Sequence, residues 1–286
     1  MQTPWGRLAL AMLLGLCAAC ASPVPQRGAA NVPGTAGSPA SAPTGTGPVY
    51  FSPGEVDSIA LLEPPPADGS DAARRDLQAV LDTQRAAHAA GTTARGVGDT
   101  VIDCQRVAEV LEPVAAQPGP SPGMGASPTV TGDGTAAVTF ATRAALQVAG
   151  ATLAPKQYWA RPRPYVVSRE VERLGDVAPY SPLAIVGGFE RAHTSYPSGH
   201  TAFGIACAIV LAQMVPEQRA ALFARGRVYG ESRVVVGAHY PTDVEAGYRV
   251  GTAAAAVMLR NSRYQSDLGA ARAQLRKALG LPLASP

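Results

Sequence analysis

The stretch Tyr196–Glu217, YPSGHTAFGIACAIVLAQMVPE, decides the fold class. Its apolar part, Thr201–Val215, runs for fifteen residues and stops at Pro216, which cannot continue a helix. Because a helix needs about 20 apolar residues to span a bilayer, this segment predicts a helix buried in a globular core. Ser198 or Gly199 stands where a helix cap is expected.

Helical periodicity extends over the rest of the body. Apolar residues recur at spacings of three and four from Asp71 onward, and no alternating pattern of a strand appears. The pattern predicts further helices over 136–154, 201–215, 217–229, 242–259 and 266–279. A Gly- and Pro-rich loop, 118–134, interrupts them and is either a flap over a site or a surface insertion. The sequence therefore predicts an all-α fold in a single helical domain.

The first 48 residues predict export and a tether. Arg7 precedes the twelve-residue apolar stretch Leu8–Ala19, and small residues follow, which is the layout of an export signal. Cleavage fits either an ordinary signal over 1–21 or a lipoprotein signal over 1–19 with lipid on Cys20. Residues 22–48 contain 22 Pro, Gly, Ala, Ser or Thr among 27, so we expect a flexible linker there. The folded domain would occupy 49–286, in the periplasm or outside the cell, with membrane attachment only through Cys20.

Length and charge exclude several classes of protein. A chain of 286 residues with 47% hydrophobic and 16% charged residues buries a core, which excludes a wholly disordered protein. The formal charge of +3 is too small for a nucleic-acid groove or a polybasic membrane patch, so we expect a small-molecule partner. No Cys/His set has zinc spacing. Cys104 and Cys207, the two cysteines of the body, are either a disulfide or buried thiols.

Scarce residues concentrate in three short segments, which hold one of two lysines and two of four histidines. The first, KQYWARPRP over 156–164, places Lys156 and Arg163 beside prolines that fix the backbone. Lysine supplies a compact charge and arginine a planar fork of donors, and both geometries suit phosphate oxygens. The segment predicts an anion clamp, with a solvated basic turn as the alternative.

The second segment, YPSGHT over 196–201, leads directly into the apolar helix. Free N–H groups and the positive end of the helix dipole meet at such a terminus and bind anions. Gly199 lets the backbone approach a ligand closely, and His200 stands beside that ligand as a proton donor. Taken alone, the segment is equally compatible with a capping histidine that has no chemical role.

The third segment, SRVVVGAHYPTD over 232–243, contains a histidine and a carboxylate four residues apart. Pro241 suits a first helical turn, so Asp243 can accept the Nδ1–H of His239. His239 would then present an unprotonated Nε2, a nucleophile oriented by a carboxylate. Arg233 adds another fork for the same anion. A buried structural His–Asp pair is the alternative.

Together and in order, these segments resemble the signature of bacterial class A non-specific acid phosphatases, within the type 2 phosphatidic acid phosphatase and vanadium haloperoxidase superfamily. The family pattern is Lys-x6-Arg-Pro, Pro-Ser-Gly-His and Ser-Arg-x5-His-x3-Asp. It agrees here at Lys156, Arg163, Pro164, Pro197, Ser198, Gly199, His200, Ser232, Arg233, His239 and Asp243. The resemblance covers about residues 59–279 and implies an all-α fold.

The resemblance also implies an activity: hydrolysis of phosphomonoesters, with broad specificity, through a covalent phosphohistidine and without a metal. His239 would attack phosphorus, Asp243 would orient it, and His200 would serve as general acid and then base. The phosphoryl oxygens would be held by Lys156, Arg163, Ser198, Gly199 and Arg233. We expect no resident cofactor, although phosphate or vanadate fits such a site, and family members often form homo-oligomers.

Two other functions share parts of this pattern. A vanadate-dependent haloperoxidase has the same signature, but the length and the proline-rich segment Leu62–Ser70 favour the secreted phosphatases. A non-enzymatic phosphate-binding lipoprotein would not need the oriented nucleophile. Outside the signature, Arg161 is expected either to support the site or to face solvent, His193 to lie on a loop surface, and His88 to have no role. The sequence does not specify the preferred phosphomonoester.

Overall fold

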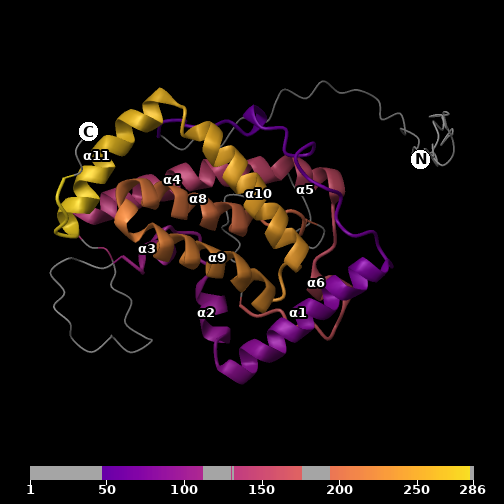
Figure 1. Cartoon of the computed structure of the whole chain (residues 1–286). Helices are drawn as coiled ribbons and strands as arrows, with labels where there is room; N and C mark the ends of the chain where they lie inside the picture. Colours follow the sequence, from indigo (N-terminus) through magenta and orange to yellow (C-terminus); the bar gives the residue numbers. More distant parts are fainter. Residues whose placement is uncertain (1–46, 112–129, 131, 176–193, 284–286) are drawn as a thin grey trace, which may run out of the picture. The chain divides into compact units, whose positions relative to one another are not determined.

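Helix α8 (Gly199–Met214) is surrounded by other helices in the computed structural model, which describes residues 47–111, 130, 132–175 and 194–283 (Figure 1). Thirteen of its 16 residues are buried, as the apolar stretch predicted. Helices α4 (Asp133–Ala149), α9 (Arg219–Val235) and α10 (Pro241–Met258) pack against it. The core is therefore built around the helix whose amino terminus carries YPSGHT, the second of the three sequence motifs (156–164, 196–201 and 232–243).

The remaining elements complete an all-α arrangement, and no strand occurs in the described part of the chain. They are α1 (Asp71–Ala90), α2 (Thr93–Gly98), α3 (Gln105–Ala108), α5 (Leu153–Trp159), α6 (Pro164–Val167), α11 (Ser262–Ala278) and the short 3-10 turns η1 (Pro53–Glu55), η2 (Gly150–Thr152) and η4 (Pro216–Gln218). The predicted all-α fold is confirmed.

Three helix boundaries differ from the periodicity by four residues or more, the first being the start of α11 at Ser262 rather than at 266. The helix predicted over 136–154 ends at Ala149, where η2 turns the chain into α5. Helix α9 continues six residues beyond the predicted end at Tyr229. Its buried face carries residues such as Arg225 and Arg233, which an apolar pattern does not count as core. The extension places the third motif partly on a helix.

Glycines allow α8 to approach its neighbours closely. A Cβ added to Gly226 of α9 would lie 3.0 Å from the carbonyl oxygen of Gly204 in α8. On α10, a Cβ added to Gly251 would lie 2.7 Å from both the Cα and the carbonyl oxygen of Ala202. These backbone contacts set the distance between the helices whose ends carry the motifs.

Cys104 and Cys207 form a disulfide, which resolves the alternative that the sequence left open. Their Cα atoms are 5.4 Å apart, and both residues are fully buried. The bond joins α8 to the segment before α3 across 103 residues of sequence. A cross-link over such a separation contributes about 2–5 kcal/mol in small secreted domains.

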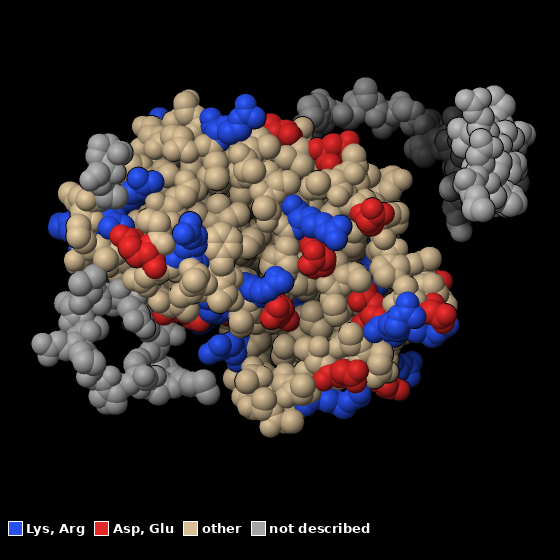
Figure 2. Space-filling view, in the orientation of Figure 1, with Lys and Arg blue, Asp and Glu red and all other residues tan. Residues whose placement is uncertain are grey.

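Figure 2 shows acidic and basic side chains interspersed on one face of the molecule, without a field of one sign. No helix among the described residues is long and apolar enough to cross a bilayer. The predicted signal over 1–21, Cys20, nearly all of the linker 22–48, most of the loop 118–134 and His193 lie outside the described residues.

We predict that Gly251→Ala destabilises the protein by about 1–3 kcal/mol, because the added methyl group meets the backbone of α8. Gly269→Ala in α11 is the matched control, since a Cβ there meets nothing within 4 Å and alanine favours a helix. Urea unfolding measures both variants. Equal stability of the two would contradict the close approach.

Candidate active site

The three motifs meet at the ends of α5, α8, α9 and α10. Lys156 lies in α5, Arg163 precedes α6, the Pro-Ser-Gly-His segment begins α8, and Arg233 lies in the last turn of α9. The backbone N–H of Ser198 donates to the carbonyl oxygen of Asp243 at 2.9 Å, so the first turns of α8 and α10 touch. The structure brings together the sequence-predicted site residues Lys156, Arg163, Ser198, Gly199, His200, Arg233, His239 and Asp243.

A tight turn between α9 and α10 positions His239. The N–H groups of Ala238 and His239 donate to the carbonyl oxygen of Arg233, at 3.0 and 3.2 Å. Gly237 has φ of +71°, and a Cβ there would lie 2.3 Å from the carbonyl oxygen of Glu172, so only glycine fits. The turn places the end of one motif helix beside the start of the next.

Two hydrogen bonds define the tautomer of His239, which is 2% exposed. Its Nδ1 lies 3.3 Å from Oδ2 of Asp243, and its Nε2 lies 3.2 Å from Nη1 of Arg163. A guanidinium only donates, so the contact with Arg163 assigns the lone pair to Nε2 and the hydrogen that Asp243 accepts to Nδ1. The backbone of Ser195 also interacts with the ring and raises its pKa, against the larger lowering effect of burial. The arrangement therefore presents an unprotonated Nε2 toward a cation.

The amino terminus of α8 combines a cap with free donors. Ser198 is the N-cap residue, and its Oγ accepts from the N–H and the hydroxyl of Thr201, at 3.2 and 2.9 Å. Its own hydroxyl hydrogen remains available to an anion. Gly199 is the first residue of the helix, where a backbone N–H has no partner within the helix.

His200 is held by the backbone of the segment between α2 and α3. Its Nε2 lies 3.2 Å from the carbonyl oxygen of Thr100, which can only accept, so Nε2 carries a hydrogen and Nδ1 is the nitrogen that exchanges a proton. The neighbouring Asp99 accepts from Arg225 at 2.5 Å and from the hydroxyl of Ser232 at 2.7 Å. These contacts, with the disulfide a few residues further on, fix the segment that orients His200.

Of the cations of the site, Arg163 and Arg233 are buried and Lys156 is partly buried. Lys156 donates to the carbonyl oxygens of Thr194 and Ser195 at 2.7 and 3.3 Å, and Arg163 donates to that of Ala238 at 2.7 Å. Arg233 is 1% exposed, and its Nε and Nη1 have no hydrogen-bond partner among the described residues. Because an unsatisfied buried donor costs free energy, these two N–H groups are suited to an anionic ligand.

Burial and repulsion between positive charges lower the pKa values of basic groups in the site. Burial, followed by the charges of nearby arginines, lowers the pKa of both His200 and His239 well below the ordinary value. Burial and the charge of Arg163 lower the pKa of Lys156, and the same two causes lower that of Arg233 to about 10. An anion bound between these groups would relieve the repulsion.

Arg161 lies next to the pair formed by His239 and Asp243, which we call the dyad, and does not face solvent. It is 6% exposed, and its guanidinium donates to Asp243 and to Asp76 of α1, at 2.7 and 2.8 Å. The sequence motifs did not include Asp76. Its spacing of four from Val80, on the buried stripe of α1, was the available signal. Buried charges at such positions require a partner.

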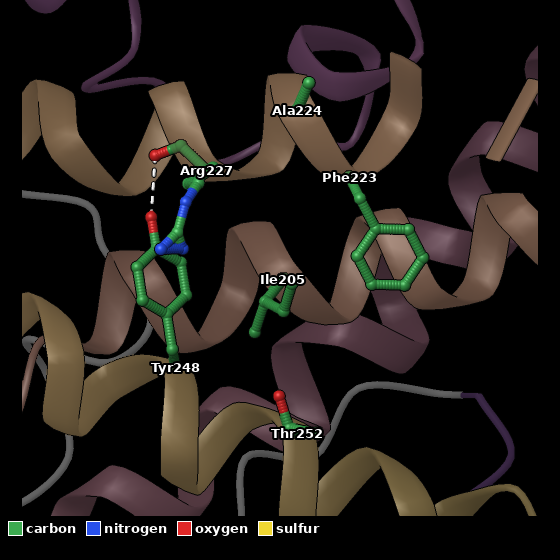
Figure 3. A pocket seen from close by; sticks show the side chains of 6 residues that line it. All are labelled: Ile205, Phe223, Ala224, Arg227, Tyr248 and Thr252. Carbon is green, nitrogen blue, oxygen red and sulfur yellow. Dashed lines mark hydrogen bonds between the residues drawn. The ribbon is translucent and has the colours of Figure 1, made fainter. Parts of the chain in front are cut away.

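Other candidates lie apart from this site. His88 is exposed and pairs with Glu172, its Nε2 lying 3.1 Å from the carboxylate. No group of three or more His, Cys, Asp or Glu suited to a metal occurs among the described residues. A groove of about 390 Å³ over α8, α9 and α10 contains no motif residue, and Figure 3 shows the side chains that line it. Its lining consists of Ile205, Phe223, Ala224, Arg227, Tyr248 and Thr252.

Comparisons with known proteins indicate the family to which the chain is similar. A family model described as the PAP2 superfamily matches residues 135–267, which include all three motifs. The non-specific acid phosphatase of Salmonella typhimurium is 30% identical over 230 residues, covering 79% of this chain and 83% of that protein. An acid phosphatase of Zymomonas mobilis is 35% identical over 128 residues, 43% of each chain. The non-specific acid phosphatase of Providencia stuartii is 41% identical over 83 residues, which cover 29% of this chain and 34% of the Providencia protein.

The long alignment with the Salmonella protein extends beyond the motif region to most of both chains. The family model and the named relatives confirm the resemblance found in the sequence. The chain belongs to the class A-type non-specific acid phosphatases of the PAP2 superfamily and is a phosphoric monoester hydrolase.

Proposed function

We propose that this chain is a secreted acid phosphatase that hydrolyses a broad range of small phosphomonoesters through a covalent phosphohistidine. The observation that carries the proposal is the tautomer of His239, whose unprotonated Nε2 faces Arg163 within a group of cations. A protein that only binds phosphate needs the cations but not a histidine oriented by a buried carboxylate.

In the first step, the phosphoryl oxygens replace protein partners of the cations. Arg233 offers its unpaired N–H groups, Arg163 exchanges its contact with His239 for a phosphoryl oxygen, and the first N–H of α8 adds a donor. The Nε2 lone pair of His239 then forms a bond to phosphorus while the bond from phosphorus to the ester oxygen breaks. His200 gives its Nδ1 proton to the leaving alkoxide.

In the second step, His200 accepts a proton from water through the same Nδ1. The hydroxide attacks phosphorus, the bond from phosphorus to Nε2 breaks, and His239 returns to its neutral form with inorganic phosphate released. Asp243 accepts the Nδ1–H of His239 throughout and stabilises the positive ring of the phosphohistidine. Lys156, Arg163 and Arg233 supply the charge that stabilises the transition state, so the proposed reaction requires no metal.

The same proposal extends to the setting of the enzyme. The disulfide between Cys104 and Cys207 supports an oxidising compartment, as the predicted export signal does. We propose a periplasmic or secreted protein, attached to a membrane only if Cys20 carries lipid. Phosphate or vanadate would bind as a substrate or transition-state mimic, and homo-oligomers are proposed from the family resemblance alone.

We predict that His239→Ala lowers kcat for p-nitrophenyl phosphate by at least about a thousandfold, since the nucleophile is lost. Phosphate should still raise the Tm of this variant, because the cations remain. His88→Ala, at an exposed histidine of α1, is the matched control and should keep full activity. Wild-type protein that gains Tm from phosphate but hydrolyses no phosphomonoester would identify a binding protein instead.

The lowered pKa values of the two histidines predict an acidic optimum. His239 must be neutral, so kcat/KM falls below its lowered pKa; His200 must be protonated, so kcat/KM falls above its own. The bell-shaped profile should therefore centre below about 6.5. Arg233→Met removes a charge that lowers the pKa of His200 and should move the alkaline limb to higher pH. A rate that rises steadily through pH 9 would contradict this scheme.

We predict that His200→Gln lowers kcat more for alkyl phosphates than for p-nitrophenyl phosphate. Glutamine can keep the hydrogen bond to Thr100 but cannot donate a proton to a poor leaving group. The loss should reach about 10²–10⁴-fold for alkyl esters and stay smaller for the aryl ester. Equal losses for both substrates would remove His200 from the role of general acid.

A further inference from the structure

Asp76 of α1 is a buried carboxylate outside the three motifs and outside the matched family region. Its side chain is 4% exposed and accepts three hydrogen bonds. Nη2 of Arg161 donates at 2.8 Å, and the hydroxyl and the backbone N–H of Thr242 donate at 2.5 and 3.3 Å. Thr242 is the second residue of α10, so Asp76 ties α1 to the turn that carries the catalytic carboxylate.

Both terminal nitrogens of Arg161 donate hydrogen bonds to other groups of the protein. Nη1 donates to Asp243 at 2.7 Å and to Thr242 at 2.8 Å, Nη2 donates to Asp76, and the guanidinium carbon lies 3.8 Å from the centre of the Tyr240 ring. Arg233 differs, since two of its buried nitrogens have no partner in the described part of the chain. Arg233 is therefore suited to the substrate and Arg161 to the dyad.

The two oxygens of Asp243 have separate partners. Oδ1 accepts from Arg161, and Oδ2 accepts from the backbone N–H of Tyr240 at 3.0 Å and faces Nδ1 of His239. A protonated carboxyl group would lose acceptor capacity and hold His239 less firmly. The orientation of the nucleophile thus depends on a fully buried carboxylate remaining charged.

We propose that Asp76 and Arg161 are positioning residues for the dyad: Asp76 fixes Arg161, and Arg161 keeps Asp243 charged and aimed at His239. This inference rests on the proposed function, because it assigns these residues to the nucleophile of that reaction. It gives α1 a role in catalysis although its side chains include none of the motif residues.

Charges from several elements act on Asp243. Burial raises its pKa, and Arg161 is the first group that opposes this effect, ahead of Lys156. The charged and titratable groups around the dyad are Lys156 on α5, Arg161 and Arg163 after α5, Tyr196 before α8, His200 in its first turn, Arg233 on α9 and Tyr240 before α10. Asp76 on α1 acts on Arg161. Without Arg161, Asp243 takes up a proton at higher pH.

The experiment compares Arg161→Met, Arg161→Lys and Asp76→Asn in the full-length protein. Arg161→Met should lower kcat about 10- to 100-fold, by analogy with residues that orient catalytic ligands. It should change KM and inhibition by phosphate less than about threefold, because the groups proposed to hold phosphate remain. The acid limb of kcat/KM should move to higher pH by about one unit.

The two conservative variants separate charge from geometry. Arg161→Lys keeps the charge but lacks the planar fork that reaches two carboxylates, so the acid limb should return while kcat recovers only in part. Asp76→Asn should lower kcat without moving the acid limb, since the charge of Arg161 is retained. Arg276→Met, which removes a buried arginine paired with Glu217 in another part of the fold, is the control and should leave the pH profile unchanged.

The proton resonance of the His239 Nδ1–H, assigned by its absence in His239→Gln, provides a readout that needs no turnover. It should move or broaden in Arg161→Met and persist in Arg276→Met. An unchanged resonance and an unchanged acid limb in Arg161→Met would overturn the inference, as would the same shifts in Arg276→Met. If wild-type protein lacked phosphatase activity but Arg161→Met altered the resonance, the proposed function would fail and the positioning pair would stand.

Discussion

The hydrogen bond between Nδ1 of His239 and Asp243 is the interaction on which the site depends. It requires two residues four apart to face each other across the start of α10, which in turn requires Pro241 in the first turn and the tight reversal at Gly237. The same turn places Arg233 next to the dyad. Close packing of α10 on α8 then brings the anion-binding terminus of α8 to the nucleophile. A small number of backbone constraints therefore assembles residues that lie far apart in the sequence.

The site accumulates positive charge on buried and partly buried side chains. Lys156, Arg163 and Arg233 lie close enough to lower the pKa of His239, and two nitrogens of Arg233 have no partner in the part of the chain that the structure describes. Such an arrangement opposes folding, because buried charges and unpaired donors cost free energy. A bound phosphoryl group would balance the positive charge and would accept hydrogen bonds from the unpaired nitrogens of Arg233. The surrounding core and the disulfide at Cys104 supply the stability that this arrangement requires.

The sequence predicted the central helix, and which motif residues the structure brings together, better than it predicted the contacts that support them. The length and apolarity of the stretch after His200 were sufficient for α8, and rare residues at fixed spacings indicated the site. Helix α9 was predicted too short because the buried residues of its last turns include Gly230, Ser232 and Arg233, which an apolar pattern does not count as core. The pairing of Cys104 with Cys207 and the contact between Asp76 and Arg161 join segments far apart in sequence, and spacing contains no information about such distances. Only the position of Asp76 on the buried stripe of α1 indicated that it has a partner.

The central claim is that Nε2 of His239 attacks phosphorus. The most direct measurement is to quench the enzyme during turnover of a phosphomonoester, digest it under alkaline conditions that preserve phosphohistidine, and locate the phosphoryl group by mass spectrometry. The account predicts a phosphoryl group on His239, absent when the substrate is omitted. A phosphoryl group on any other residue, or hydrolysis by a single attack of water shown by inversion at a chiral phosphorus, would contradict it.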